Sequence, residues 1–273
     1  MLLKVRLASH EAIGADADRV ARALEERGLK VEHVGANAAA ELRLSSGVEV
    51  GRLAWDDIAA VIELPEPRDI VVTFDEGSTG LTSIPEGASV GVSGRLRREM
   101  LGVHRPDLRA VGIDDGYVVV GLLDQREIAA WIAPIGEVRM AGLADDMKEV
   151  LVPTSWATEV GRGMLILEAR GTSRAVMEHV ASLDEPGARG ALAAELEVSR
   201  RLGASSDAPL GVLARAHGRS LRLRALVPSA RGQRLVRAEV SGKLLDPSEA
   251  ARRIAERLLA RGAAELLEPE VRE

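Results

Sequence analysis

The sequence contains no cysteine. This absence excludes disulfides, a thiolate nucleophile, cysteine metal ligands and a thioether link to a cofactor. The five histidines are far apart, and none has a second histidine at the spacing of an HxH or HxxxH pair. Because a metal site needs several ligands at close spacing, we expect no metal site.

Long hydrophobic runs are also missing. No apolar stretch approaches the ~20 residues needed to cross a bilayer, and the first residues, MLLKVRLASHEAIG, lack the pattern of a cleaved signal. The net charge is −6 and the pI is about 5.6, whereas general nucleic-acid binders carry a strongly basic face. We therefore expect a cytoplasmic protein with neither membrane nor nucleic acid as a partner.

Side-chain amides are scarce. Asn37 is the sole asparagine, Gln125 and Gln233 are the only glutamines, and arginine far exceeds lysine. Depletion of amides and cysteine together with abundant charge fits a heat-adapted source. A GC-rich genome would give much of the same bias, so both explanations stay open.

What the sequence does contain is enough apolar residues, 46%, for a globular protein of two or three domains. Residues 3–9 alternate as a strand, a helix with Val20, Ala21 and Leu24 on one face follows, and residues 29–35 predict a second strand. This order indicates a βαβ unit with a parallel sheet. Residues 56–64 predict a buried strand, and 65–69 a break.

The middle of the chain repeats this alternation. Helices are expected at residues 94–102 and near 137–142. Strand-like runs lie at residues 70–74, 88–93, 109–113, 117–123, 128–135 and, as a buried return strand, 162–170. We expect a second α/β domain here.

The last third changes to an antiparallel pattern. A helix near 189–202 precedes strands at 210–216, 220–227 and 234–242, which are separated by short turns. In the final helix Asp246 is the expected cap, Pro247 the first helical residue, and Gly262 the end. This region predicts a small sheet with a helix on one face.

Six segments, in order, resemble motifs of the hydroxymethylbilane synthase family, also called porphobilinogen deaminase. They are EPRDIVVT (66–73, "DPRD"), SIPEGASVGVSGRLRRE (83–99, "VGTSSLRR"), HRPDLRA (104–110, "RRPDL"), ATEVGRGMLILEAR (157–170, "AVGQGALGIE-R"), AAELEVSRRLGASSDAPLG (193–211, "AERAFLRRLEGGCQVPIG") and residues 221–267. The resemblance implies an α/β fold in which two lobes of parallel or mixed sheets form a clamshell like that of periplasmic binding proteins, with a small α+β domain at the C-terminus.

The resemblance also implies three domains. The first α/β domain would comprise residues 1–66 and 155–178, shortened and completed by the return strand. The second α/β domain would comprise residues 67–154. The C-terminal antiparallel sheet and its helix would comprise residues 179–273.

The chemistry of this family depends on a cysteine that carries a dipyrromethane cofactor and on an aspartate in an "HSMKD-P" loop. The cysteine position falls on Ser206, and a hydroxyl is a far poorer nucleophile than a thiolate at neutral pH. The aspartate loop is missing, because IELPEPRD follows WDDIAAV directly. From these absences we expect no cofactor, since the dipyrromethane group cannot be attached through cysteine, and we assign no catalytic residue.

The family also binds acetate and propionate groups through arginines. Two of these positions fall near His10 and Ala12, and a third run becomes GIDDGYVVV, which has no arginine. The arginines that remain are Arg97 and Arg98, with Arg95 beside them, at the start of a helix, where carboxylates or phosphates bind well. A solvated basic face is the alternative.

Arg162, the loop around Ser206, and Arg68 are three further candidate positions. Arg162 replaces the glutamine of the family's "GQG" and is either a ligand contact or part of an ordinary turn. Ser206 and its neighbours Ser205 and Asp207 either bind a ligand or form a plain surface loop. Arg68 is expected to anchor the crossing between the lobes together with Asp69.

Three functions follow as hypotheses. In the first, the chain is a divergent family member whose catalysis is lost or altered and which binds an anionic small molecule, tetrapyrrole-like or another polycarboxylate, through Arg97 and Arg98. In the second, it is an active synthase that condenses four porphobilinogens on a non-covalent primer. In the third, it is a non-catalytic partner-binding protein. We expect a monomer.

Overall fold

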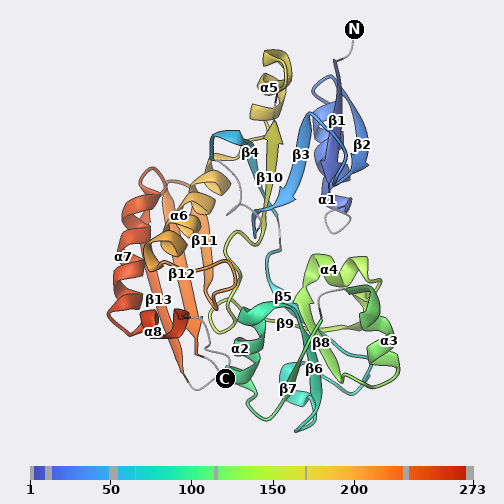
Figure 1. Cartoon of the computed structure of the whole chain (residues 1–273), viewed down its shortest axis with the longest axis vertical. Coiled ribbons are helices and arrows are strands. Elements are labelled where there is room, and N and C mark those ends of the chain that lie inside the picture. Colours follow the sequence, from blue (N-terminus) through green and yellow to red (C-terminus); the bar gives the residue numbers. More distant parts are fainter. Residues whose placement is uncertain are drawn as a thin grey trace.

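The first lobe is a five-stranded mixed sheet in the order β2-β1-β3-β10-β4 (Figure 1). The computed structural model describes residues 3–9, 14–48, 55–64, 66–113, 116–169, 171–229 and 234–268, so His10, Ala12 and both acids of GIDDG lie outside the described residues. The strands are β1 (Leu3–Ser9), β2 (Leu29–Gly35), β3 (Leu42–Ser46), β4 (Ile58–Glu63) and β10 (Met164–Ala169).

The first βαβ unit is formed as predicted. Strand β1 pairs in parallel with β2 and with β3, and the connecting helix is α1 (Gly14–Glu25). Strand β10 returns late in the chain and pairs antiparallel with both β3 and β4. Helix α5 (Arg174–Ala181), which follows β10, buries Val176 and Val180 in the core of this lobe.

The second lobe is also a five-stranded mixed sheet, in the order β7-β6-β8-β5-β9. Its helices are α2 (Gly94–His104), α3 (Val119–Asp124) and α4 (Ile135–Met140). Its strands are β5 (Asp69–Val72), β6 (Ser89–Val92), β7 (Arg109–Gly112), β8 (Ala130–Pro134) and β9 (Met147–Val150). Four 3-10 turns, Trp55–Asp57, Leu81–Ser83, Gly116–Val118 and Ala144–Asp146, connect described elements.

One predicted strand is wrong. Residues 117–123 form the turn Gly116–Val118 and helix α3 instead. The valines gave this run its strand character, since β-branched residues favour strands. Within the run, however, Val119 and Leu123 are buried four residues apart, while Val118 and Val120 are exposed. This is helical periodicity, and burial of the one face overrides the local preference.

The C-terminal unit is a three-stranded antiparallel sheet covered on one face by helices. The strands are β11 (Gly211–His217), β12 (Ser220–Pro228) and β13 (Leu235–Lys243). The helices are α6 (Pro186–Leu202), α7 (Pro247–Leu259) and α8 (Ala263–Leu267). Asp246 caps α7 as predicted, accepting a hydrogen bond from the Glu249 N–H at 3.1 Å, but α7 ends at Leu259 and Gly262 begins α8.

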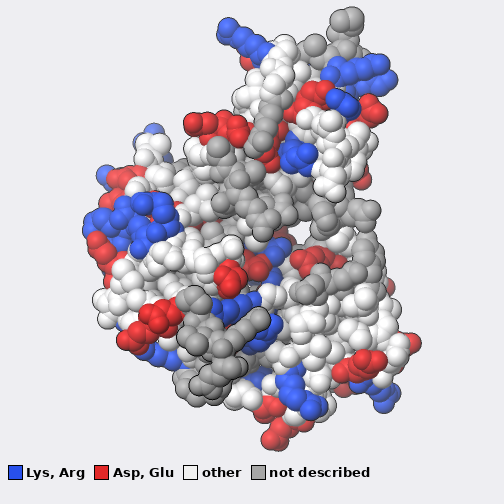
Figure 2. All heavy atoms as spheres, viewed as in Figure 1, with Lys and Arg blue, Asp and Glu red and all other residues white. Residues whose placement is uncertain are grey.

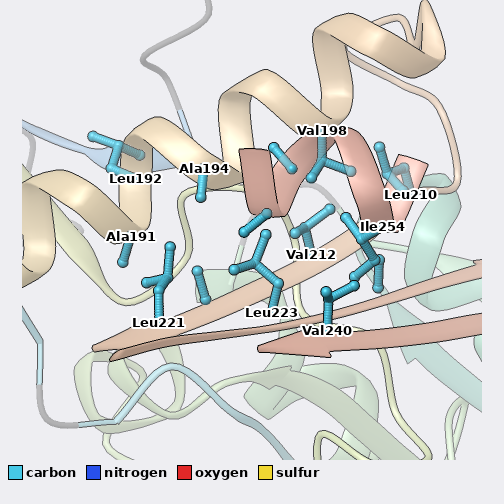
Figure 3. Close-up of a cluster of buried hydrophobic side chains, with 14 of the residues drawn as sticks. Ala191, Leu192, Ala194, Val198, Leu210, Val212, Leu221, Leu223, Val240 and Ile254 are labelled. Carbon is cyan, nitrogen blue, oxygen red and sulfur yellow. The ribbon is translucent and has the colours of Figure 1, made fainter. Parts of the chain in front are cut away.

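The largest core joins the C-terminal unit to the first lobe. Figure 3 shows Ala191 and Ala194 of α6 pointing toward the side chains of the sheet, among them Leu221 and Leu223. Ile58 and Val61 of β4 and Ile166 of β10 belong to the same cluster. Helix α6 is therefore packed against two sheets, which fixes the C-terminal unit to the first lobe.

The predicted fold class is confirmed: two α/β lobes with mixed sheets and a small α+β unit. The domain boundaries at residues 66, 154 and 178 stay a prediction. In the described part of the chain, no helix combines the length and apolar character that spanning a membrane requires.

Candidate functional site

Arg97 lies in the first turn of α2, where the second lobe meets the segment that returns to the first. It is 2% exposed. Its guanidinium donates to both carboxylate oxygens of Asp69, at 2.9 Å each. The Trp156 Nε1–H donates to the same carboxylate at 2.9 Å. Asp69 thus holds α2 and the return segment to the start of β5.

Glu159 is the second carboxylate on Arg97, at 3.0 Å from Nη2. The same oxygen, Oε2, also accepts hydrogen bonds from the Nε of Arg162, at 3.1 Å, and from its Nη2. Burial acts to raise the pKa of Glu159, but the guanidinium groups of Arg162 and Arg97 outweigh it and hold the pKa at about 2. Glu159 is therefore ionised over the whole neutral range.

Glu137, from the first turn of α4, completes this cluster, its Oε1 lying 3.7 Å from Nη1 of Arg162. Burial raises the pKa of Glu137, and the charges of Arg162 and Arg97 offset this only in part. The junction cluster, defined as Asp69, Arg97, Glu137, Glu159 and Arg162, contains two guanidinium groups and three carboxyl groups. Its arginines are thus already neutralised by side chains of the protein.

The other two candidate arginines of α2 lie apart from this cluster. Arg98 is exposed, and its Nη2 lies beside Gly112 of β7, 3.9 Å from where a Cβ of that glycine would stand. Arg95 donates from Nη2 to the Glu268 carbonyl at 3.4 Å, and its Nε is 3.9 Å from Glu99. The Arg95 Nε is buried without a hydrogen-bond partner. Arg95 therefore has one donor without a hydrogen-bond partner, although its charge is paired with that of Glu99.

The loop that contains Ser206 follows α6, whose C-cap is Gly203 with a φ of 63°. Ser205, Ser206 and Asp207 are exposed, and the Ser205 hydroxyl donates to Asp207 Oδ1 at 2.6 Å. This hydrogen bond is the main cause of the lowered pKa of Asp207, to which the charge of Arg95 adds. The structure therefore places Arg95 near the Ser206 loop, and Arg162 with Arg97 at the junction.

Sequence reasoning missed the carboxylates of this site. Arg68 and Asp69 were expected at the crossing between the lobes, but not their partners, which are Glu66 for Arg68 and Arg97 for Asp69. Glu159 stands where the family motif "AVGQG" has alanine, three residues before Arg162. This spacing was a readable signal of a compensating ion pair. Glu137 and Trp156 come from distant parts of the chain, and no local pattern marks them.

Comparison with known proteins identifies relatives over most of the chain. A protein of Roseiflexus castenholzii called porphobilinogen deaminase is 31% identical over 257 residues, covering 92% of this chain and 84% of the relative. Another of the same name, from Rubrobacter xylanophilus, is 35% identical over 211 residues, covering 77% and 68%. A third, from Methylobacillus flagellatus, is 30% identical over 211 residues, covering 77% and 67%.

Solved structures of solute-binding proteins are similar at a lower level. A putative methionine-binding lipoprotein of Bacillus subtilis gives a TM-score of 0.47 at 10% identity, covering 66% of this chain and 89% of that one. A marine metagenome TRAP solute-binding protein specific for aromatic acids also gives 0.47, at 12% identity, covering 72% and 78%.

The expectation of no cofactor is corrected by the family model that matches residues 55–178, "Porphobilinogen deaminase, dipyromethane cofactor binding domain". This match points to that cofactor and away from none. The expectation rested on the missing thiol, which excludes one type of attachment and leaves other types of binding untouched. The residues present do not fit a thioether-linked group, because the chain has no cysteine and the loop position is Ser206. No chemical step on a thioether-linked cofactor is therefore assigned to this chain.

The order of the motifs, the match of the family model and an identity of 30–35% over most of the chain lead to one conclusion. The chain belongs to the porphobilinogen deaminase family.

Proposed function

We propose that this protein is a divergent member of the porphobilinogen deaminase family that binds a carboxylate-bearing linear pyrrole non-covalently, with catalysis lost or altered. The observation that carries the proposal is Ser206, exposed in the loop where the family has its cysteine. A serine hydroxyl is a far poorer nucleophile than a thiolate, so we propose that hydrogen bonds, charge and packing retain the pyrrole ligand.

Arg95 is the residue on which this binding would depend most. Its buried Nε has no hydrogen-bond partner and lies 3.9 Å from the Glu99 carboxylate, and its charge acts on Asp207 of the Ser206 loop, so Arg95 can donate to a ligand carboxylate there. Arg97 cannot do so, because Asp69 and Glu159 already accept its hydrogen bonds. The candidates from the sequence were Arg95, Arg97, Arg98 and Arg162, and we propose that the binding rests on Arg95 among them.

The second candidate is an active synthase that uses a non-covalent primer, and the names of its relatives favour it. A non-catalytic partner-binding role is the third. We further propose, on composition alone, that the protein acts in the cytoplasm as a monomer without nucleic acid or membrane partners.

The test combines binding, turnover and mass. The protein is incubated with porphobilinogen, uroporphyrin is measured after acid oxidation, and intact mass is measured under denaturing and native conditions. We expect a pyrrole adduct in the native spectrum, no mass increment after denaturation, and little or no product.

Variants locate the binding. Arg95→Ala should weaken porphobilinogen binding about tenfold or more, which corresponds to ~1.4 kcal/mol. Arg98→Ala removes the same charge from the same helix and should leave binding unchanged. Product formation at an ordinary rate would replace the proposal by the second candidate, and absence of any binding would leave the partner-binding role.

A further inference from the structure

The outer face of the C-terminal sheet carries a second group of charges, which includes no residue of the junction cluster. Strands β12 and β13 pair so that Arg224 stands opposite Glu239 and Leu226 opposite Arg237. The other face of this sheet packs against α6 and α7. On the outer face Leu226 packs into the core of the second lobe together with Trp156, and the polar side chains lie on the rest of this face.

The single carboxylate of this group is fully used by two arginines. Glu239 Oε2 accepts from Arg224 at 2.9 Å and 3.2 Å, and its Oε1 accepts from Arg222. The hydrogen bond from Arg224 is the main cause of the lowered pKa of Glu239, so it stays ionised and paired. No acid is left for further cations.

Two more guanidinium groups lie at the same place. Arg237 and Arg261 form no ion pair with any residue in the described ranges, and Arg237 is exposed. The group thus contains four guanidinium groups and one carboxylate, which pairs with two of them, in a protein whose net charge is −6. Bringing like charges together costs free energy, which a bound anion would recover.

Arg261 is held in position by a ladder of hydrogen bonds from α7 to β13. Arg253 donates to the Ser241 carbonyl at 3.2 Å, Arg257 to that of Glu239 at 2.7 Å, and Arg261 to that of Arg237. The donors are four residues apart, a rise of ~6 Å along a helix, and the acceptor carbonyls are two residues apart, ~6.6 Å along a strand. Each arginine therefore lies opposite one carbonyl of β13. Figure 2 shows Lys and Arg side chains gathered over α7.

Arg261 and charged side chains of β12 and β13 line a pocket of about 380 Å³. Its walls are Arg224, Arg237, Arg261, Glu239 and, from the segment between β9 and β10, Thr154; Leu226 and Ala238 form the apolar part. Sites of this volume hold small molecules, and guanidinium groups bind oxyanions through two parallel hydrogen bonds. Thr154, which is exposed, adds a hydroxyl donor.

We propose that this pocket, the basic pocket, binds a small anion with two or more negative charges, bearing phosphate or carboxylate groups. The basic pocket is separate from the pyrrole site at Arg95, since it shares no residue with the junction cluster or the Ser206 loop. Its ligand is a second molecule and not the pyrrole.

Isothermal titration calorimetry and thermal denaturation at constant ionic strength test this proposal, with pyrophosphate, inorganic phosphate and citrate as probes and sodium chloride as reference. We expect saturable binding of at least one probe and a higher melting temperature. Tighter binding of pyrophosphate than of citrate indicates a preference for phosphate groups, and the reverse order indicates a preference for carboxylate groups.

The variant Arg237→Ala removes an exposed side chain without hydrogen bonds to described residues, so it should fold as the native chain does. It should weaken binding at least about fivefold, and Arg237→Ala/Arg261→Ala at least about tenfold. Arg174→Ala, on the 93% exposed Arg174 side chain of α5, removes the same charge elsewhere and should leave affinity within about twofold. Equal weakening by the control, or no binding beyond the chloride reference, would overturn the proposal.

Discussion

At the scale of single residues, Glu159 controls what the junction cluster can bind. Its carboxylate occupies both Arg97 and Arg162, in the place that a ligand carboxylate would take. Glu159→Gln removes this charge and leaves Arg97 paired with Asp69, so Arg162 should become the available cation, raising porphobilinogen affinity about tenfold while lowering the free energy of unfolding by about 2 kcal/mol, as expected for lost charge-assisted hydrogen bonds. Calorimetry and urea unfolding measure the two effects.

The matched control is Glu178→Gln, which removes an exposed carboxylate paired with Arg174 at 3.0 Å. Surface ion pairs contribute little, so neither affinity nor stability should change by more than about 1 kcal/mol. If Glu159→Gln binds porphobilinogen no better than the native protein, the arginines of the cluster serve structure alone.

Gly161 is a second residue whose identity matters. Its φ is 79°, and an added Cβ would stand 2.1 Å from the Gly47 carbonyl oxygen. The oxygen belongs to the backbone of Gly47 and the added Cβ would be bonded directly to the backbone of residue 161, so neither atom can move aside cheaply. Gly161→Ala should therefore cost about 3 kcal/mol or more in unfolding free energy, combining left-handed strain with overpacking.

Gly171→Ala separates these two causes. Gly171 also has a positive φ, 64°, but nothing lies within 4 Å of its Cβ position. This variant should cost only about 1 kcal/mol, the strain alone. Equal losses in urea unfolding of the two variants would show that the close approach to Gly47 is unimportant.

The residue scale is also where sequence reasoning was weakest. Motifs led to Arg95, Arg97, Arg98 and Arg162, but no motif told which of them already had acidic partners. Asp69 is 28 residues from Arg97 and Glu159 is 62 residues from it. Such pairings depend on how the lobes meet, which local periodicity does not encode.

At the scale of elements, helix α6 is tied to its surroundings by one buried carboxyl group. Glu195 accepts hydrogen bonds from the Gly161 N–H at 2.6 Å and the Ala214 N–H at 2.7 Å. Burial raises the pKa of Glu195 to about 8, although these two N–H groups act to lower it. The folded protein therefore keeps Glu195 protonated at pH values where the unfolded chain ionises it.

The sign of the pH dependence follows. The contribution of Glu195 to stability is full below its ordinary pKa of 4.5 and is lost as the pH rises through about 8. Between pH 5 and 8 the unfolding free energy should fall by up to about 1.4 kcal/mol per pH unit. Glu195→Gln should lack this slope in urea unfolding, and an unchanged slope would contradict the assignment.

Elements were predicted well where burial followed one clear period. The βαβ unit, helix α2 and the C-terminal sheet with α7 were read from alternation, helical spacing and capping residues. Strands β3 and β9 and helices α5 and α8 were not foreseen, because they are short and only partly apolar. Helix α3 was mistaken for a strand because its valines are exposed on one side and buried on the other.

At the scale of the whole molecule, the ladder from α7 covers the outer edge of the C-terminal sheet. Strand β13 is an edge strand, and an uncovered edge invites pairing with a second chain. Arg253→Ala/Arg257→Ala should uncover the Ser241 and Glu239 carbonyls and cause concentration-dependent association. Light scattering should give 29.0 kDa for the native chain and a larger mass for the variant.

Arg252→Ala is the control for this prediction, because Arg252 lies on the same helix but pairs with Glu256 and not with the strand. It should stay at the mass of one chain. Association of the native chain or of the control to the same degree would show that the ladder does not protect the edge.

The late return of β10 also bears on the order in which the newly made chain can fold. Strands β3 and β4 are not neighbours in the finished sheet, since β10 is inserted between them. When Glu63 is added to the growing chain, the strand that must separate them is still about 100 residues from synthesis. The strands of the second sheet, complete at Val150, are all available earlier. Synthesis therefore favours closure of the middle of the polypeptide first, with the amino-terminal sheet waiting for β10.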